Sequence, residues 1–486
     1  MPQPIAARAP DLDPSIRGDA EMLPSMIGLI AFACHIAGII SAMHAVMHTR
    51  TPQGAFAWAL GLVLLPYITL VPYLYLGRSH FLGYSRLDRM RRQRMSSQDV
   101  SAEPWIVPPE CERYAAIASM LGNRFHAGQK LRLLVDGEAA FAAMFEAIAQ
   151  AEQCLLVQFF IFHDDALGRR MQHALLERAA AGVQVCVLFD GIGSHALPKH
   201  YVETLQAGGV AIHPFATLQH RSRFQLNFRN HRKILVVDGW RGFVGGLNVG
   251  DEYLGLKPPL APWRDTHLEL QGPAVADLQH SFSQDWHWVT GERPPQLAPR
   301  PSLGPAQTMI ANTGPADRQE SCSLFFVGVI NAARQRVWLT TPYFVPDQAV
   351  MSALRLAVYR GVDVRVLIPA RPDHRTVFLS STLHAYEALR TGIRVYRYQP
   401  GFVHQKVLLV DDDSAVVGSM NLDSRSFRLN FEVSALNVDR AFAGEVEAML
   451  QADFAHSVEL TENEYRDSPY LRRLAMHVAR LFDPIL

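Results

Sequence analysis

This sequence of 486 residues has few lysines, few cysteines and no net charge. The formal net charge at pH 7 is +0, so no global electrostatic field favours nucleic acid as a partner. The five cysteines are odd in number and lack the spacing of metal ligands, which argues against a disulfide framework and fits a reducing compartment. Lysine contributes only five residues against 41 arginines, so each lysine marks a position where a guanidinium has not been used.

Charged residues are also missing from two long stretches near the N-terminus. No Asp, Glu, Lys or Arg occurs in 22–49 or in 51–77. Each stretch is long enough to cross a hydrocarbon core of about 30 Å. A cleaved signal peptide has an apolar region of only about 7–15 residues and no second span behind it. The sequence therefore predicts a hairpin of two transmembrane helices, with spans at about 23–47 and 55–76.

Basic residues predict the orientation of this hairpin. Arg50 is alone in the connecting loop, whereas a cluster of arginines follows the second span: Arg78, Arg86, Arg89, Arg91, Arg92 and Arg94. Because cytoplasmic flanks carry an excess of basic residues, we expect the large C-terminal part and the N-terminus on the cytoplasmic side. The same cluster can attract anionic headgroups, at about 1 kcal/mol per basic residue near the surface.

Beyond the hairpin, one unit occurs twice. Each copy has a strand, a helix, a second strand preceded by Gly, a further helix and strand, and a closing signature that contains His-x-Lys. This alternation predicts an α/β fold of two α/β/α sandwich lobes in a pseudo-two-fold arrangement. The predicted division is a membrane hairpin with its basic segment at 1–95, a first lobe at 110–290 and a second lobe at 306–486, joined through 96–109 and 291–305.

The last part of the chain is predicted to be an amphipathic helix. Its apolar stripe consists of four residues: Leu471, Leu474, Val478 and Leu481. Three arginines lie off the stripe: Arg472, Arg473 and Arg480. The pattern leaves two positions open for this helix, on a membrane surface or packed on the second lobe.

The two signatures have identical internal spacing. Each reads His-x-Lys, four residues, Asp, six residues, Gly-small-x-Asn: His231, Lys233, Asp238, Gly245 and Asn248 in the first copy, and His404, Lys406, Asp411, Gly418 and Asn421 in the second. Residues two apart in a strand project to the same face, so His and Lys leave each copy side by side. Two such copies supply a nucleophile, a proton donor and cations for a phosphate diester, with no metal or other cofactor required.

The double signature resembles the HKD motif of the phospholipase D superfamily. Similarity to bacterial cardiolipin synthases then extends over nearly the whole chain and rests on five segments: 72–78 (PYLYLGR), 188–194 (LFDGIGS), 263–273 (WRDTHLELQGP), 341–347 (TPYFVPD) and 421–432 (NLDSRSFRLNFE). The resemblance implies that two phosphatidylglycerol molecules react to give cardiolipin and glycerol. It also implies anionic membrane lipids as partners and a multi-pass location in the bacterial cytoplasmic (inner) membrane.

The resemblance implies a mechanism as well. One histidine attacks phosphorus and forms a phosphohistidine, and the other protonates the departing glycerol and then deprotonates the hydroxyl of a second phosphatidylglycerol. The groups that hold the phosphoryl oxygens would be Lys233, Lys406, Asn248 and Asn421. His231 is favoured as the nucleophile by analogy with relatives that use the N-terminal motif, although the symmetry of the motifs leaves His404 open.

Four acidic residues and one serine complete the predicted site. Asp265 and Glu432 occupy the positions where relatives place the carboxylate that orients an attacking imidazole. Asp238 and Asp411 belong to the catalytic signature, but they end strands beside turns, which favours a structural role. Ser419 adds a hydroxyl near the phosphate in the second motif, where the first has Gly246.

Other functions share this signature. A phospholipase D that transfers the phosphatidyl group to water or another alcohol has the same chemistry up to the phosphohistidine, and some relatives use phosphatidylethanolamine as donor. A nuclease of the same superfamily is more distant, because it would need a basic groove for a long polyanion. A further interpretation gives the hairpin a part in lipid entry or in a homodimer.

Overall fold

The computed structural model describes residues 14–49, 51–77, 107–215, 227–298, 301, 303–317 and 319–485. The chain divides into two units, one of residues 1–79 with 224–227 and one of residues 80–223 with 228–486. The predicted arginine cluster between Arg78 and Arg94 lies outside the described residues.

The N-terminal unit contains α1 (Pro14–His48), α2 (Pro52–Leu64) and α3 (Pro66–Leu76). Thr51 caps α2 through its hydroxyl, and α2 ends before Leu65 because Pro66 lacks an N–H and disfavours a helical conformation at the preceding residue. The predicted second span is therefore two short helices rather than one continuous helix. Within the described residues, one helical segment, Gly28–His48, is long and apolar enough to cross a membrane.

Small and polar side chains mediate the packing of α1 on α2 and α3. A Cβ at Gly38 would lie 2.4 Å from a carbonyl oxygen of α2, so glycine permits the close approach. His44 Nδ1 lies 2.7 Å from the Tyr73 hydroxyl, and His35 Nδ1 lies 3.0 Å from the Tyr67 hydroxyl. The histidines that interrupt the first apolar stretch thus have hydrogen-bond partners in α3.

The second unit is built on one mixed sheet with helices on its faces. Its first part contains η1 (Pro109–Tyr114), α5 (Ala115–Leu121), β1 (His126–Val135), α6 (Asp136–Ala149), β2 (Cys154–Phe159), α7 (Ala166–Ala180), β3 (Gln184–Asp190), α8 (Lys199–Ala207), β4 (Ala211–Phe215), β5 (Arg229–Asn230), β6 (Ile234–Val237), β7 (Arg241–Gly245), η2 (Asp251–Leu254), β8 (Trp263–Arg264), β9 (Thr266–Gln271) and α9 (Val275–Thr290).

Its second part repeats this pattern and extends it. It contains β10 (Ala306–Thr313), α10 (Ser321–Ala332), β11 (Arg336–Thr340), α11 (Gln348–Tyr359), β12 (Asp363–Pro369), α12 (Arg375–Leu389), β13 (Arg394–Tyr398), β14 (Phe402–Val403), β15 (Val407–Val410), β16 (Ser414–Gly418), α13 (Ser424–Arg428), β17 (Asn430–Val438), α14 (Arg440–Ala455), β18 (Ser457–Glu459), α15 (Asn463–Arg466), α16 (Tyr470–Arg480) and η3 (Asp483–Ile485).

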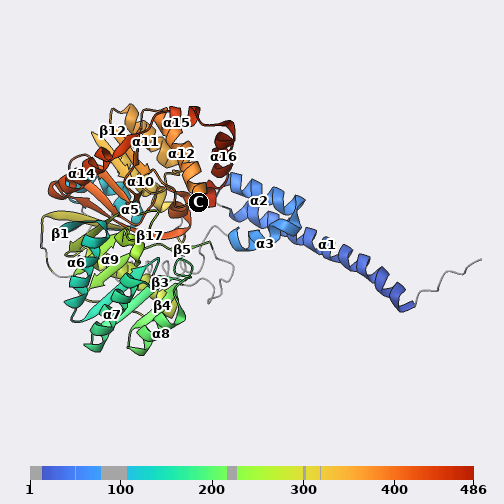
Figure 1. The fold of residues 1–486 in the computed structure, drawn as a ribbon, viewed down its shortest axis with the longest axis horizontal. Helices are drawn as coiled ribbons and strands as arrows, with labels where there is room; N and C mark the ends of the chain where they lie inside the picture. Colours follow the sequence, from blue (N-terminus) through green and yellow to red (C-terminus); the bar gives the residue numbers. More distant parts are fainter. Residues whose placement is uncertain are drawn as a thin grey trace, which may run out of the picture. The chain divides into compact units, whose positions relative to one another are not determined.

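The strand order is the same in both copies. The sheet runs β18-β13-β12-β11-β15-β16-β17-β10-β1-β9-β7-β6-β2-β3-β4, and β5 pairs with β17. The series β9-β7-β6-β2-β3-β4 therefore corresponds to β17-β16-β15-β11-β12-β13, and the antiparallel pair of β1 and β10 joins the two copies. Figure 1 shows α7 and α8 at one end of this unit and α11 and α12 at the other.

Two helices cover the middle of the joined sheet and share one apolar core. Phe282 and Trp286 of α9 belong to the same buried cluster as Phe442 and Leu450 of α14. Residues 109–121, which the sequence division assigned to the first lobe, pack in the core of the second copy, where Tyr114 belongs to a cluster formed largely by α10, α11 and their neighbouring strands. The copies are therefore more closely interlocked than a division at residue 110 implies.

The predicted C-terminal helix is α16, which packs on α12. Its contact with the body uses the buried side chains of Met476 and Ala479. The predicted apolar stripe is exposed instead: Leu471, Leu474, Val478 and Leu481.

Candidate active site

Each signature lies where a short strand leads into the next strand of its own copy. His231 and Lys233 lie between β5 and β6, and His404 and Lys406 lie between β14 and β15. The short strands, however, pair with the opposite copy, β5 with β17 and β14 with β8. A strand of each copy thus positions the signature of the other, and β14 with β8 forms a separate two-stranded sheet.

Backbone hydrogen bonds continue this exchange up to the histidines. The N–H of His231 donates to Phe431 O at 3.0 Å, and the N–H of His404 donates to Arg264 O at 2.7 Å. Each acceptor residue directly precedes a carboxylate residue in the sequence. The backbone pairing therefore decides which carboxylate each imidazole meets.

Both imidazoles contact a buried carboxylate of the opposite copy. His231 Nδ1 lies 3.0 Å from both carboxylate oxygens of Glu432, and His404 Nδ1 lies 2.8 Å from Asp265 Oδ2. Because an ionised carboxylate only accepts, Nδ1 of each ring carries the proton and donates. Each Nε2 is then unprotonated, as an attacking or proton-accepting imidazole requires, and that of His404 lies 3.0 Å from Lys406 Nζ.

The two lysines lie beside the histidines and are buried with them. Lys233 Nζ donates to His231 O at 2.7 Å, and Lys406 Nζ donates to His404 O at 2.6 Å. The charges of Lys233, Lys406 and His231 all act on His404. The structure therefore brings the two predicted His-Lys pairs into one cluster.

Burial is the main cause of the lowered pKa values in this cluster. It lowers the pKa of His231 to about 4, and with the ammonium groups of Lys406 and Lys233 it lowers the pKa of His404 well below its ordinary value. Burial also lowers the pKa of Lys406 to about 8, against the opposing carboxylate charges. A bound phosphate diester would bring a negative charge beside these groups and raise their pKa values. The cluster is therefore suited to an anion.

The two carboxylates differ in their ionisation. Burial raises the pKa of Asp265 to about 6. Burial acts in the same direction on Glu432, but the charge and hydrogen bond of His231 and the charge of Lys233 outweigh it and lower the pKa of that carboxyl. Glu432 is thus held ionised, whereas Asp265 is closer to protonation.

Hydroxyl and amide donors explain part of this difference. Ser419 Oγ donates to Glu432 Oε2 at 2.6 Å, Ser426 Oγ donates to Oε1 at 2.8 Å and Asn430 Nδ2 donates to Oε1 at 3.2 Å. Ser419 directly follows β16 and its hydroxyl contacts β17, and phosphate binding by this hydroxyl stays a prediction. Ser426 and Asn430 were missed, although both lie within six residues of Glu432 in the segment 421–432.

The first copy has no counterpart of the Ser419 hydroxyl. A Cβ at the equivalent residue, Gly246, would lie 2.1 Å from Asp265 Oδ1. Glycine at this position therefore leaves room for the Asp265 carboxylate.

The predicted phosphate-binding asparagines both contact protein groups. Asn248 Oδ1 accepts from the N–H of Ile161 at 3.2 Å, and its Nδ2 donates to the Tyr253 hydroxyl at 3.0 Å. Asn421 donates to Asp423, and within the described residues its Oδ1 has no hydrogen-bond partner. Phosphate binding by either side chain stays a prediction.

Asp238 and Asp411 lie at the opposite ends of β6 and β15 from the His-Lys pairs. Asp238 accepts from the backbone N–H groups of 152–154 at 2.8–2.9 Å, and Asp411 from those of 334–336 at 2.8–3.2 Å. Both backbones are left-handed, with φ of 48° and 54°, which Asp tolerates in turns. The carboxylates bind the chain that enters β2 and β11, which supports the structural role favoured from the sequence, and a catalytic role stays a prediction.

Aromatic rings surround His404 more than His231. The rings of Trp263 and Phe402 have centroids 5.0 and 6.0 Å from that of His404. The ring of Phe160 lies 5.1 Å from that of His231. The position equivalent to Phe402, two residues before the other histidine, is Arg229.

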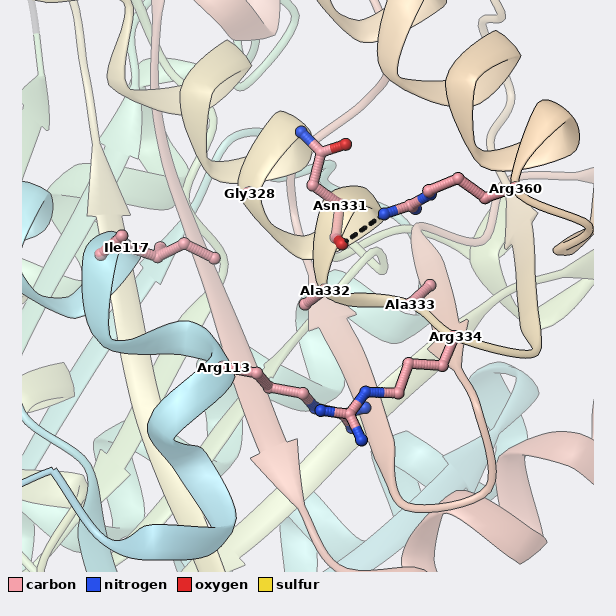
Figure 2. A pocket seen from close by; sticks show the side chains of 9 residues that line it. Arg113, Ile117, Gly328, Asn331, Ala332, Ala333, Arg334 and Arg360 are labelled. Carbon is pink, nitrogen blue, oxygen red and sulfur yellow. Dashed lines mark hydrogen bonds between the residues drawn. The ribbon is translucent and has the colours of Figure 1, made fainter.

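A separate cavity of about 490 Å³ opens between α5 and α10. Arg113, Arg334 and Arg360 line it, and Figure 2 shows Arg360 bonded to the carbonyl of Asn331. Its lining has no histidine, carboxylate or hydroxyl, so it is not a candidate catalytic site. Elsewhere in the described part of the chain, no group of three or more His, Cys, Asp or Glu side chains could hold a metal.

Comparisons with known proteins agree with this arrangement. The family model "Cardiolipin synthase, PLD-like domain" matches residues 144–286 and 326–454, one segment in each copy. In fold, the chain is similar to the crystal structure of a phosphatidylserine synthase from Haemophilus influenzae. The TM-score is 0.62 at 16% identity, over 77% of this chain and 100% of that chain. The fold and the doubled signature are those of phospholipase D-like proteins.

Relatives in sequence are more specific. The chain is 56% identical over 493 residues to Cardiolipin synthase A of Pseudomonas aeruginosa, covering 99% of this chain and 100% of the relative. It is 54% identical over 475 residues to Cardiolipin synthase A of Pseudomonas fluorescens, covering 95% and 99%. The chain belongs to the cardiolipin synthase family, which confirms the resemblance drawn from the motifs.

Proposed function

We propose that this protein transfers a phosphatidyl group between two phosphatidylglycerol molecules, giving cardiolipin and glycerol. The observation that carries this proposal is the buried cluster in which each histidine is bonded through Nδ1 to a carboxylate of the opposite copy. Two imidazoles with unprotonated Nε2 atoms beside two ammonium groups supply the nucleophile, the acid–base group and the charge for phosphoryl transfer.

His231 is the proposed nucleophile, and the difference between the carboxylates supports it. An ionised Glu432, whose pKa is lowered, keeps the His231 Nδ1–H in place and stabilises the positive charge that develops when Nε2 attacks. The new bond joins His231 Nε2 to phosphorus, and the bond from phosphorus to the glycerol oxygen breaks. His404, protonated beside the bound phosphate, gives its Nε2 proton to that oxygen.

The second step reverses these roles. Neutral His404 takes the proton of a hydroxyl on the incoming phosphatidylglycerol, and the resulting oxygen attacks phosphorus while the bond to His231 breaks. The proton that His404 gains replaces the one given to glycerol, so the cycle is balanced. Lys233, Lys406, Asn248 and Asn421 are the proposed ligands of the phosphoryl oxygens.

The two lysines are proposed to do the charge work of a metal ion. Excess chelator should therefore leave the rate of cardiolipin formation unchanged. A complete loss that a divalent ion restores would contradict this part of the proposal.

The proposed setting is a bacterial inner membrane with the catalytic part on the cytoplasmic side. In this arrangement α1 crosses once, and α2 with α3 returns as the second crossing of the hairpin. The two copies form the proposed pseudo-two-fold lobes, with His231 and His404 facing each other between them. The equal strand order supports this arrangement. A homodimer formed through the hairpin is a further proposal, which crosslinking in membranes would test.

Product analysis separates this function from its closest alternative. Purified full-length protein would be incubated with phosphatidylglycerol labelled in the headgroup glycerol and, separately, in an acyl chain. Cardiolipin plus free glycerol supports the synthase. Phosphatidic acid plus glycerol would instead identify a hydrolase. A parallel assay with phosphatidylethanolamine as donor would define the headgroup preference.

A further inference from the structure

The apolar stripe of α16 faces away from the protein. Leu471 and Leu481 are 75% and 77% exposed, and Leu474 and Val478 between them are about half exposed, at 46% and 47%. Phe482 extends the stripe beyond the helix and is 47% exposed. We call this set the C-terminal stripe.

This orientation is the reverse of an ordinary surface helix, which turns its apolar side to the core. Successive residues of a helix are rotated by about 100°, so the stripe lies on roughly the opposite side of α16 from Met476 and Ala479. Those two small or flexible side chains make the contact with α12. The packing of α16 on the protein therefore does not use the side chains of the C-terminal stripe.

The stripe ends beside the proposed active site. Asp483 in η3 accepts hydrogen bonds from Ser380 and His384 of α12, which anchor the turn after α16. The same turn contacts α13, the short helix that carries Ser426. Because Ser426 donates to Glu432, the stripe is separated from the carboxylate–histidine pair by one short helix.

We propose that the C-terminal stripe inserts into the interface of an anionic bilayer and holds the site against its lipids. This inference rests on the proposed function, in which both substrates are bilayer lipids. Charge supports the choice of partner, because Arg473 and His477 follow one border of the stripe at helical spacing and suit anionic headgroups. Pairing of two stripes between copies would instead bring these basic flanks together.

A fluorescent probe tests the contact independently of activity. In full-length protein with Cys34→Ala, the remaining native cysteines are buried. Leu474→Cys would carry an environment-sensitive dye, and the control Tyr359→Cys would carry it on α11, at another exposed apolar position. In phosphatidylglycerol vesicles, we expect a blue shift and quenching by lipids with acyl-chain quenchers at 474 and neither at 359.

Two outcomes of this measurement would overturn the proposal. Equal emission at both positions would leave the stripe in water. A blue shift that appears without lipid, rises with protein concentration and resists lipid-borne quenchers would assign the stripe to a second copy of the chain. Neither result depends on whether cardiolipin is formed.

Activity provides the second test. The variant Leu471→Glu/Val478→Glu/Leu481→Glu should lower the rate on bilayers by about tenfold or more, because three charged groups would have to leave water. It should keep the rate of the parent on phosphatidylglycerol dispersed in detergent. The matched variant Leu356→Glu/Tyr359→Glu/Val458→Glu, at three exposed apolar positions elsewhere, should keep both rates. An unchanged bilayer rate in the first variant would overturn the proposal, whereas absence of cardiolipin from the parent would refute the function itself.

Discussion

The two halves of the candidate site have the same strand order and unequal chemistry. Around His231 and Glu432 the side chains at four equivalent positions are polar or charged: Arg229, Ser419, Ser426 and Asn430. Around His404 and Asp265 the same positions are aromatic or small: Phe402, Gly246, Tyr253 and Trp263. A doubled fold has therefore kept its geometry while the surroundings of its two histidines diverged.

Because of this difference, the Glu432 carboxylate keeps its charge, whereas the Asp265 carboxylate can be protonated near neutral pH. The charge and hydrogen bond of His231, the charge of Lys233 and the Ser419 hydroxyl lower the pKa of Glu432, so the carboxylate is ionised and His231 keeps one tautomer. Asp265 accepts from the N–H of Thr266 at 2.8 Å and from Trp263 at 3.5 Å, and burial nevertheless raises its pKa to about 6. Fixed orientation suits a nucleophile, and easy proton exchange suits an acid–base group.

Removal of either imidazole should have the largest effect. His231→Ala and His404→Ala should each lower cardiolipin formation by about 10⁴-fold or more, since water at neutral pH replaces neither role. A phosphatidyl donor whose leaving group departs without a proton should distinguish the two variants. His404→Ala should then still release one leaving group per site in a rapid burst, whereas His231→Ala should not. A burst from His231→Ala alone would exchange the proposed roles.

Loss of the carboxylate charges should come next. Glu432→Gln and Asp265→Asn should lower kcat by about 10³-fold, because an amide no longer fixes the Nδ1–H tautomer. The burst with the activated donor should fall in Glu432→Gln and persist in Asp265→Asn. Circular dichroism of both variants would control for folding. Equal loss of the burst would show that the two carboxylates are functionally equivalent.

Substitution by alanine should lower kcat more at Gly246 than at the equivalent residue, Ser419. Gly246→Ala should cost about 10²-fold in kcat, because its Cβ would displace the Asp265 carboxylate. Ser419→Ala should cost only about tenfold, since it removes one of several donors to Glu432. Steady-state kinetics with thermal unfolding as control would measure both. A larger effect at Ser419 would refute the steric explanation.

The smallest expected effect is the dependence of kcat/KM on pH. Asp265 stabilises the positive charge of protonated His404 only when it is ionised itself, so activity should fall below about pH 6. Lys406 binds phosphate only when protonated, so activity should fall above about pH 8. Asp265→Asn should abolish the acid limb, and Lys406→Arg should move the alkaline limb upward. A wild-type profile without either limb would contradict these assignments.

Local patterns predicted much of this molecule. Spacing alone identified the two signatures and the repeated strands, because His-x-Lys and strand periodicity are local properties. The pairing of His231 with Glu432 was not predictable in the same way, since it depends on β5 joining the opposite copy. The stripe of α16 was found correctly, but the face that packs is decided by Met476 and Ala479, which no periodicity distinguishes.

The exchange of carboxylates between copies has a consequence for biosynthesis. His231 and Glu432 are 201 residues apart in sequence, and His404 and Asp265 are 139 apart. Contacts of such high sequence separation are slow to form and arise late on a folding pathway. A chain emerging from the ribosome has no complete histidine–carboxylate pair until the second copy is made. Neither imidazole can therefore be oriented by its carboxylate before both copies have been synthesised and joined.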